Sequence, residues 1–148
     1  MSPTPLKSWP EAAPRLVAVA AGREAADLVI QDVRLVNVHS RGVLDWQVAV
    51  AEGRIACIGP DASHCIGENT AVIEGGGRYL IPGLCDAHMH IESGMLTPAE
   101  FAAAVIPHGT TTMFTDPHEI ANVLGLEGVR RLHDEALMQP INLVTQMP

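Results

Sequence analysis

The sequence predicts an α/β protein in which a small β-domain precedes alternating strands and helices. Residues 27–74 contain short, β-branched apolar runs divided by turn residues, which is typical of strands. From Gly83 onward, apolar runs alternate with stretches that carry helix-start signals, and this alternation indicates parallel βαβ units. The chain has 148 residues and 47% hydrophobic residues, so a packed core is feasible.

Residues 1–24 are predicted to form a leader and a short helix. The first ten residues are rich in proline and predict a loose segment, whereas residues 11–23 are rich in alanine and favour a helix. This region lacks the charged-then-apolar pattern of a signal peptide, and no run of about 18 apolar residues follows it. We therefore expect a cytoplasmic protein with no membrane partner.

Residues 25–82 are predicted to be the first part of a small β-domain. Glu52 and Gly53 lie between two apolar runs and predict a hairpin turn, and the run of three glycines at 75–77 predicts a second turn. The spacing of these runs predicts an antiparallel sheet. The expected strands are residues 28–30, 33–38, 48–51, 54–58 and 71–74.

Residues 83–148 are predicted to form three parallel strands joined by two helices. Thr97, Pro98 and Glu100 have the pattern of an N-cap, a first helical position and a capping box. The second helix is expected to run to about Met138 with an interruption near Gly125. The three predicted strands are residues 84–87, 110–115 and 141–145.

Three strands and two helices cannot close an eight-stranded barrel, which typically needs about 250 residues. The pattern therefore leaves two possibilities, a small open α/β unit or the front part of a longer protein. The last predicted strand is followed by no helix that could cover it. We expect the second possibility.

The first predicted strand of this region is followed by a candidate metal site. Side chains alternate between the two faces of a strand, so Asp86, His88 and His90 should share one face. Two imidazoles on one face can bind the same ion, and zinc, iron and manganese all accept such ligands. Two unrelated loop histidines are the alternative.

Four further polar residues are candidates for a supporting or substrate-binding role. Glu92 follows the histidine strand, and Asp116, His118 and Glu119 follow the next strand, at the strand ends where barrel active sites form. A simple structural role is also available, because Asp116 could cap the next helix and Glu119 could close its capping box. A solvated carboxylate is the alternative for Glu92.

Charge and cysteine content limit the partners and the compartment. The net charge of −8 argues against a nucleic-acid partner. The three cysteines, Cys57, Cys65 and Cys85, show no metal-binding spacing, and so odd and small a number fits a reducing compartment. We interpret all three as small apolar residues that are buried.

Four stretches of the sequence resemble a known family. Residues 82–90 (PGLCDAHMH) are similar to the amidohydrolase superfamily of metal-dependent hydrolases. The narrower resemblance, to the adenine deaminases within that superfamily, rests on residues 88–98 (HMHIESGMLTP), 107–112 (PHGTTT) and 116–125 (DPHEIANVLG).

The resemblance implies a TIM-like (β/α)8 barrel preceded by part of a small β-sandwich domain, of which this chain would be the N-terminal fragment. It also implies that a metal-bound hydroxide deaminates adenine to hypoxanthine and ammonia. His88 and His90 would be the first two ligands of a binuclear manganese or iron centre, with zinc as a further possibility. The catalytic residues would lie beyond Pro148, so the 148-residue chain alone is expected to be inactive.

The family also implies a homo-oligomer for the full-length protein. Two other functions stay open at this stage. One is a different amidohydrolase that acts on cyclic amides, of the dihydroorotase or imidazolonepropionase type. The other is a non-catalytic remnant.

Overall fold

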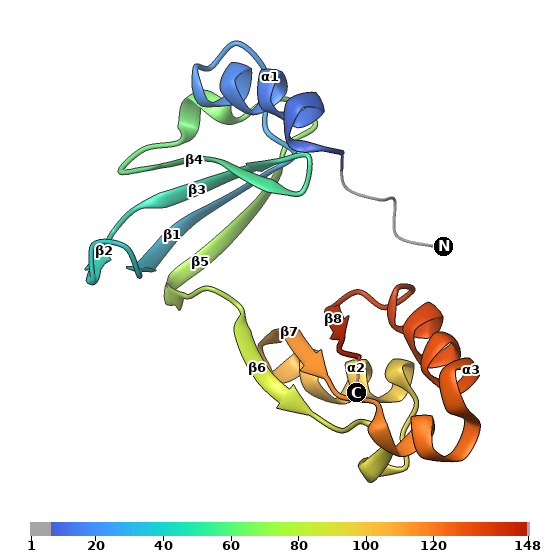
Figure 1. Cartoon of the computed structure of the whole chain (residues 1–148). Helices are drawn as coiled ribbons and strands as arrows, with labels where there is room; N and C mark the ends of the chain where they lie inside the picture. Colours follow the sequence, from blue (N-terminus) through green and yellow to red (C-terminus); the bar gives the residue numbers. More distant parts are fainter. Residues whose placement is uncertain (1–6, 148) are drawn as a thin grey trace. The chain divides into compact units, whose positions relative to one another are not determined.

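The computed structural model describes residues 7–147 and contains two compact units, the second of which begins at Gly83 (Figure 1). The leader predicted for residues 1–10 lies mostly outside the described residues. The first unit, called here the N-terminal unit, contains α1 (Trp9–Ala20), β1 (Leu28–Asn37), β2 (Gly42–Leu44), β3 (Gln47–Ala51), β4 (Arg54–Gly59), η1 (Ser63–Cys65) and β5 (Ala71–Leu80). The second, the C-terminal unit, contains β6 (Leu84–Met89), η2 (Glu92–Gly94), α2 (Pro98–Val105), η3 (Ile106–His108), β7 (Thr110–Thr115), α3 (His118–Ala136) and β8 (Asn142–Thr145).

The sheet of the N-terminal unit is mixed rather than antiparallel. β3 pairs antiparallel with β4 and with the first residues of β1, and β2 pairs antiparallel with the last residues of β1. β5 runs parallel to β1 along its other edge. The prediction of a purely antiparallel sheet is therefore wrong for β5, because more than thirty residues separate β1 from β5 and a connection of that length can return the chain in the same direction.

The predicted glycine turn lies inside β5, opposite an irregularity in β1. Asp32 has a φ of 51°, and the β1–β5 register shifts between Gln31 and Val33. A Cβ added to Gly75 would lie 2.2 Å from the Val33 side chain and 2.6 Å from the Asp32 carbonyl oxygen. Gly75 is therefore needed where two strands approach closely, and the glycine run forms a bulged part of the strand instead of ending it.

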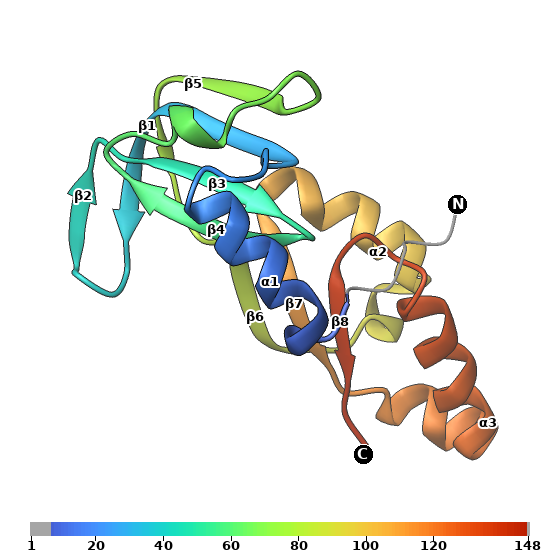
Figure 2. The ribbon, with the colours of Figure 1, turned by 90° about the horizontal axis from the view of Figure 1, so that it is seen from above.

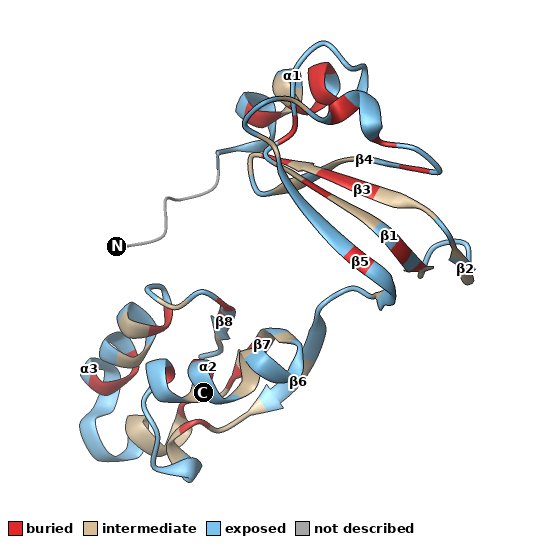
Figure 3. Ribbon diagram, turned by 180° about the vertical axis from the view of Figure 1, so that it is seen from behind, coloured by how far each residue is buried: buried red, intermediate tan, exposed pale blue. Residues whose placement is uncertain are grey.

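Helix α1 covers the sheet of the N-terminal unit beside β3 and β4 (Figure 3). It begins at Trp9, earlier than predicted, and the Glu11 carboxylate accepts hydrogen bonds from the backbone N–H and the hydroxyl of Ser8 at its start. Its buried side chains meet those of the sheet in one core, which also contains a cysteine. The buried members are Ala12, Leu16, Val19, Ala26, Val29, Ala49, Ala51, Ala62 and Cys65.

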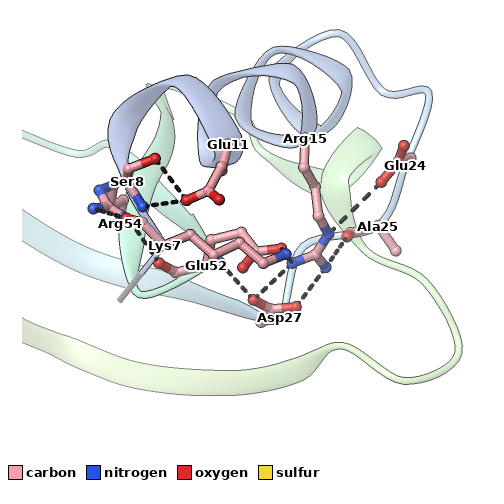
Figure 4. Close-up of polar contacts among 9 residues, drawn as sticks. All are labelled: Lys7, Ser8, Glu11, Arg15, Glu24, Ala25, Asp27, Glu52 and Arg54. Atoms are coloured by element: carbon pink, nitrogen blue, oxygen red, sulfur yellow. Dashed lines mark hydrogen bonds and ion pairs between the residues drawn. The ribbon is translucent and has the colours of Figure 1, made fainter. Parts of the chain in front are cut away.

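A polar network joins α1 to the sheet (Figure 4). The Arg15 guanidinium donates to both carboxylate oxygens of Asp27, at 2.5 and 3.0 Å, and to Glu52 at 3.4 Å. The Lys7 ammonium lies 2.8 Å from the same Glu52 carboxylate. Hydrogen bonds from Arg15 lower the pKa of Asp27, and Lys7 lowers that of Glu52.

We expect Arg15→Ala to lower the free energy of unfolding by about 1 kcal/mol, because the bidentate pair is partly exposed. The two carboxylates have lowered pKa values in the folded state, so their contribution is present above the unfolded-state pKa and is lost as the pH falls through the folded-state pKa. Thermal melts between pH 7 and pH 3 should show a smaller acid-induced decrease in Tm for Arg15→Ala than for the parent. Arg23 makes no side-chain ion pair within residues 7–147, so Arg23→Ala serves as the control.

The C-terminal unit is the predicted series of parallel βαβ units. Its strands lie in the order β6-β7-β8 and all pairs are parallel. α2 and α3 pack on one side of this sheet (Figure 2). The predicted capping box is confirmed, since Glu100 N–H donates to the Thr97 hydroxyl and Thr97 N–H donates to the Glu100 carboxylate. The buried core consists of Ile91, Ala102, Met113, Ala136, Ile141 and Leu143.

The start of α3 differs from the prediction. The helix begins at His118 with Pro117 as its N-cap residue, and no side chain caps it. The interpretation of Asp116 as the N-cap is therefore wrong, and its carboxylate is available for other contacts. The predicted interruption is confirmed, because Gly125 has φ 59° and ψ −152° within α3. Within residues 7–147, no helix is both long and apolar enough to cross a membrane.

Candidate metal centre

The candidate site lies where β6 and β7 end. The two strands are parallel and Met89 pairs with Thr115, so the residues after both strands meet at one edge of the sheet. The backbone continues this pairing for one more step, since Asp116 N–H donates to the Met89 carbonyl at 2.9 Å. The sheet therefore brings His88 and His90 close to Asp116, which is 26 residues further along the chain from His90.

The two histidine rings converge on one point. The Nε2 atoms of His88 and His90 lie 3.0 Å apart, and the rings are nearly perpendicular with centroids separated by 4.7 Å. Metal–imidazole bonds of 2.0–2.1 Å place two nitrogens of one ion about 2.9–3.4 Å apart, depending on the coordination angle. The separation found here is thus already suitable for a shared ion.

The orientation of His90 is fixed by the backbone. Its Nδ1 atom lies 2.9 Å from the Asp116 carbonyl oxygen, which can only accept a hydrogen bond. Nδ1 therefore carries the proton and Nε2 presents its lone pair toward His88. This is the arrangement in which a second hydrogen-bond partner sets the tautomer of a metal-binding imidazole.

Asp116 supplies a carboxylate beside the two rings. One ligand atom each from His88, His90 and Asp116 can be chosen within 4.8 Å of one another. The Oδ2 atom of Asp116 lies 3.2 Å from Nδ1 of His118, while Oδ1 is buried and has no hydrogen-bond partner within residues 7–147. A buried carboxylate oxygen without a partner is costly, and a cation at this position would satisfy it. The donor set therefore fits a divalent metal.

The other three predicted residues surround this cluster without joining it. The His118 ring packs edge-on against His90, with a centroid separation of 4.6 Å. Glu92 Oε1 accepts from the Ile120 N–H at 3.4 Å, and its Oε2 is buried with no partner in the described residues. Glu119 accepts a hydrogen bond from the Ser93 hydroxyl. Glu92 and Glu119 thus connect the β6 side of the site to α3.

Sequence reasoning missed two contributions to this arrangement. The Asp116 carbonyl that orients His90 is a backbone group, and no residue type indicates it in advance. Ser93 contacts Glu119 across 26 positions of sequence, which only the packing of η2 against α3 reveals.

Comparison with known proteins gives one family match and a set of close relatives. Residues 79–148 match the model of the amidohydrolase family. The chain is 72% identical, over its full length, to an adenine deaminase of Ruegeria pomeroyi and covers 25% of that protein. It is 49% identical to an adenine deaminase of Moorella thermoacetica over 90% of this chain and 22% of the relative. The chain therefore spans about a quarter of the length of these relatives.

Two solved structures are similar in fold. An L-hydantoinase from Arthrobacter aurescens matches 81% of this chain and 27% of its own length, with a TM-score of 0.61 and 24% identity. A molinate hydrolase matches 82% of this chain and 30% of its own length, with a TM-score of 0.60 and 18% identity. At these identities the likeness concerns the fold alone. The predicted resemblance to adenine deaminases of the amidohydrolase superfamily is confirmed, and this family is metal-dependent.

Proposed function

We propose that this chain is part of an adenine deaminase, which hydrolyses adenine to hypoxanthine and ammonia at a metal centre that includes His88 and His90. The observation that carries the proposal is the convergence of these two imidazoles in a chain that is 67–72% identical to five adenine deaminases. Manganese or iron is the metal we propose, with zinc as the alternative. The full-length protein is proposed to be a homo-oligomer.

The two units have separate places in this proposal. Residues 25–82 belong to a small β-sandwich domain, with residues 1–24 as its leader and first helix. Residues 83–148 are the first βα units of a TIM-like barrel. Support comes from the parallel order β6-β7-β8 with α2 and α3 on one side, which is how a barrel of this type begins.

His88 and His90 would hold the ion, and Asp116 would contribute charge beside it. A divalent ion in such a site lowers the pKa of water toward 7 and so supplies a nucleophile for the purine ring. The chain's own contribution is orientation: the Asp116 carbonyl holds the His90 tautomer, and the edge-on contact with His118 limits the ring's rotation. We propose that the remaining ligands and the proton-transferring group belong to the other three quarters of the relatives' length.

A chimeric enzyme tests this function directly. The 148 residues replace the matching segment of the Ruegeria pomeroyi adenine deaminase, to which they are 72% identical. We expect the manganese-loaded chimera to release ammonia from adenine, and the 148-residue chain alone to release none. Hydrolysis needs an ion that is firmly held, with one coordination position open, and a group that transfers protons. Three ligand residues at the ends of two strands do not provide both.

Two results would contradict the proposal. The first is a folded, metal-loaded chimera that leaves adenine unchanged but opens a cyclic amide such as dihydroorotate, which would place the chain in the other class of amidohydrolases. The second is metal-dependent adenine turnover by the 148-residue chain alone, which would show that the described residues already complete the site.

A further inference from the structure

The N-terminal unit contains a second cluster of metal-binding side chains, made by Cys57, His64 and Cys65. One donor atom of each lies within 4.8 Å of the others. The three residues do not belong to the family match, which begins at residue 79, and they play no part in the centre formed by His88 and His90. The sequence interpretation of the cysteines as buried apolar residues is wrong for Cys57, which is partly exposed, and for Cys85, which is exposed.

The chain is folded so that these residues meet. Cys57 lies in β4, opposite Ala49 of β3. The chain then turns back through η1, whose start is fixed by a hydrogen bond from the Ser63 N–H to the Asp61 carboxylate at 2.8 Å. The Cys65 carbonyl accepts from the Ala26 N–H at 2.8 Å, so the end of η1 is held against the start of β1.

Cys65 is the buried donor of the cluster. Its side chain is part of the core beneath α1, and its Sγ donates to the Val19 carbonyl at 3.3 Å. Burial raises the pKa of the Cys65 thiol, and the neighbouring Cys57 raises it further. In the absence of a cation the thiol is therefore protonated, and binding of an ion must release that proton.

His64 is the exposed donor, and its orientation is also fixed. Its Nε2 lies 3.2 Å from the Ala20 carbonyl, to which it donates, so Nδ1 has a free lone pair. The ring packs against Gly22, where an added Cβ would lie 3.4 Å from the ring. A carbonyl that accepts a hydrogen bond from one ring nitrogen leaves the other nitrogen free to bind an ion, and this is the usual support for a metal-binding imidazole.

We propose that Cys57, His64 and Cys65 bind a thiophilic divalent ion, zinc, with water in the fourth position. Tetrahedral zinc places its sulfur and nitrogen ligands about 3.5–3.8 Å apart. Side-chain rotations that move the donor atoms by about 1 Å therefore suffice to close the site. Two thiolates and one imidazole select zinc over the manganese that nitrogen and oxygen donors accept. The ion would tie β4 to η1, and through the hydrogen bond from His64 to the Ala20 carbonyl it would hold the end of α1, while the Cys65 thiolate would no longer donate to the Val19 carbonyl.

Cobalt titration tests the site without interference from the histidine centre. Thiolate-bound Co²⁺ shows intense sulfur-to-cobalt charge-transfer absorption, which nitrogen and oxygen ligands do not produce. The reduced, metal-free 148-residue chain should bind one equivalent of Co²⁺ with this absorption and lose it when Zn²⁺ is added. The double variant His88→Ala, His90→Ala should retain the absorption, because the second centre contributes no sulfur.

Single substitutions identify the ligands. Cys57→Ser should abolish most of the charge-transfer absorption, whereas Cys85→Ser, which removes an exposed thiol in β6, should leave it unchanged. His64 is exposed, so His64→Ala should fold normally and bind Zn²⁺ more than tenfold more weakly. Excess Zn²⁺ should raise the Tm of the parent chain by roughly 5 °C or more, and should raise that of His64→Ala by less.

Three outcomes would overturn the proposal. One is a folded, reduced chain that shows no charge-transfer absorption with Co²⁺. Another is absorption that persists in Cys57→Ser. The third is a disulfide between Cys57 and Cys65 that stays oxidised at the cytosolic ratio of reduced to oxidised glutathione. The two sulfurs would then be close because they form a covalent bond, and they could not bind an ion.

Discussion

His88→Ala in the chimeric deaminase is expected to lower the turnover of adenine about a thousandfold or more. The substitution removes one of the two converging imidazoles, so the ion would lose a ligand that positions it. His90→Ala should have a similar effect, and the double variant should be little worse than either single variant, because the ligands act as a unit. Ammonia release and the ultraviolet change from adenine to hypoxanthine measure the rate.

The control for this experiment is another histidine of the same unit. His108 is exposed in η3 at the far end of α2, and its side chain makes no hydrogen bond within residues 7–147. His108→Ala should therefore keep near-parental turnover and metal content. If the double variant His88→Ala, His90→Ala kept near-normal rates, the assignment of the metal centre would be lost, whatever the fate of the chimera itself.

The part of this site that the sequence predicts is the part that depends on local geometry. His88 and His90 are two residues apart at the end of β6, and strand alternation predicts their shared face, although His90 lies one residue past the strand and the β6–β7 register shifts between Asp86 and Met89. The capping box at Thr97 and Glu100 and the break at Gly125 are local in the same sense. Each can be predicted from fewer than five neighbouring residues, although the Asp116 carbonyl, 26 residues away, also orients the His90 ring.

The contacts that the sequence did not predict are long-range. β5 could have joined the sheet in either direction, and its parallel pairing with β1, in which Gly75 lies close to Val33, joins segments that are more than thirty residues apart. Cys57 and Cys65 are separated by seven residues, a spacing typical of no metal motif, and the return of the chain through η1 brings them together. Residue type and spacing do not contain that information.

Asp116 shows how a local pattern can be misleading. The sequence Asp116-Pro117-His118-Glu119 has the composition of a helix start, yet α3 begins one residue later than that pattern implies and no side chain caps it. The carboxylate instead contacts His118 with one oxygen and leaves the other buried without a hydrogen-bond partner within residues 7–147. Asp116 could act as a helix cap or as a charge beside the metal. These two roles can be separated by a substitution that preserves capping but removes the charge.

Asp116→Asn is that substitution. Asparagine caps helices as well as aspartate does, and it keeps the backbone carbonyl that orients His90, so stability and the His90 tautomer should be preserved. It removes the negative charge that faces the ion. We expect the chimera with Asp116→Asn to bind Mn²⁺ about 10–100-fold more weakly, and to lose more turnover at limiting metal than at saturating metal. Calorimetric titration of the metal-free protein gives the affinity.

Glu119→Gln is the matched control, because Glu119 lies three residues away at the start of α3 and its carboxylate contacts Ser93 outside the cluster of His88, His90 and Asp116. Its metal affinity should stay within about threefold of the parent, since a charge that is not aimed at the ion is screened by solvent. Equal Mn²⁺ affinity for Asp116→Asn and the parent would show that the unpartnered oxygen is not facing a cation. In that case the centre would consist of the two imidazoles and ligands from other parts of the full-length enzyme, with Asp116 contributing its backbone carbonyl alone.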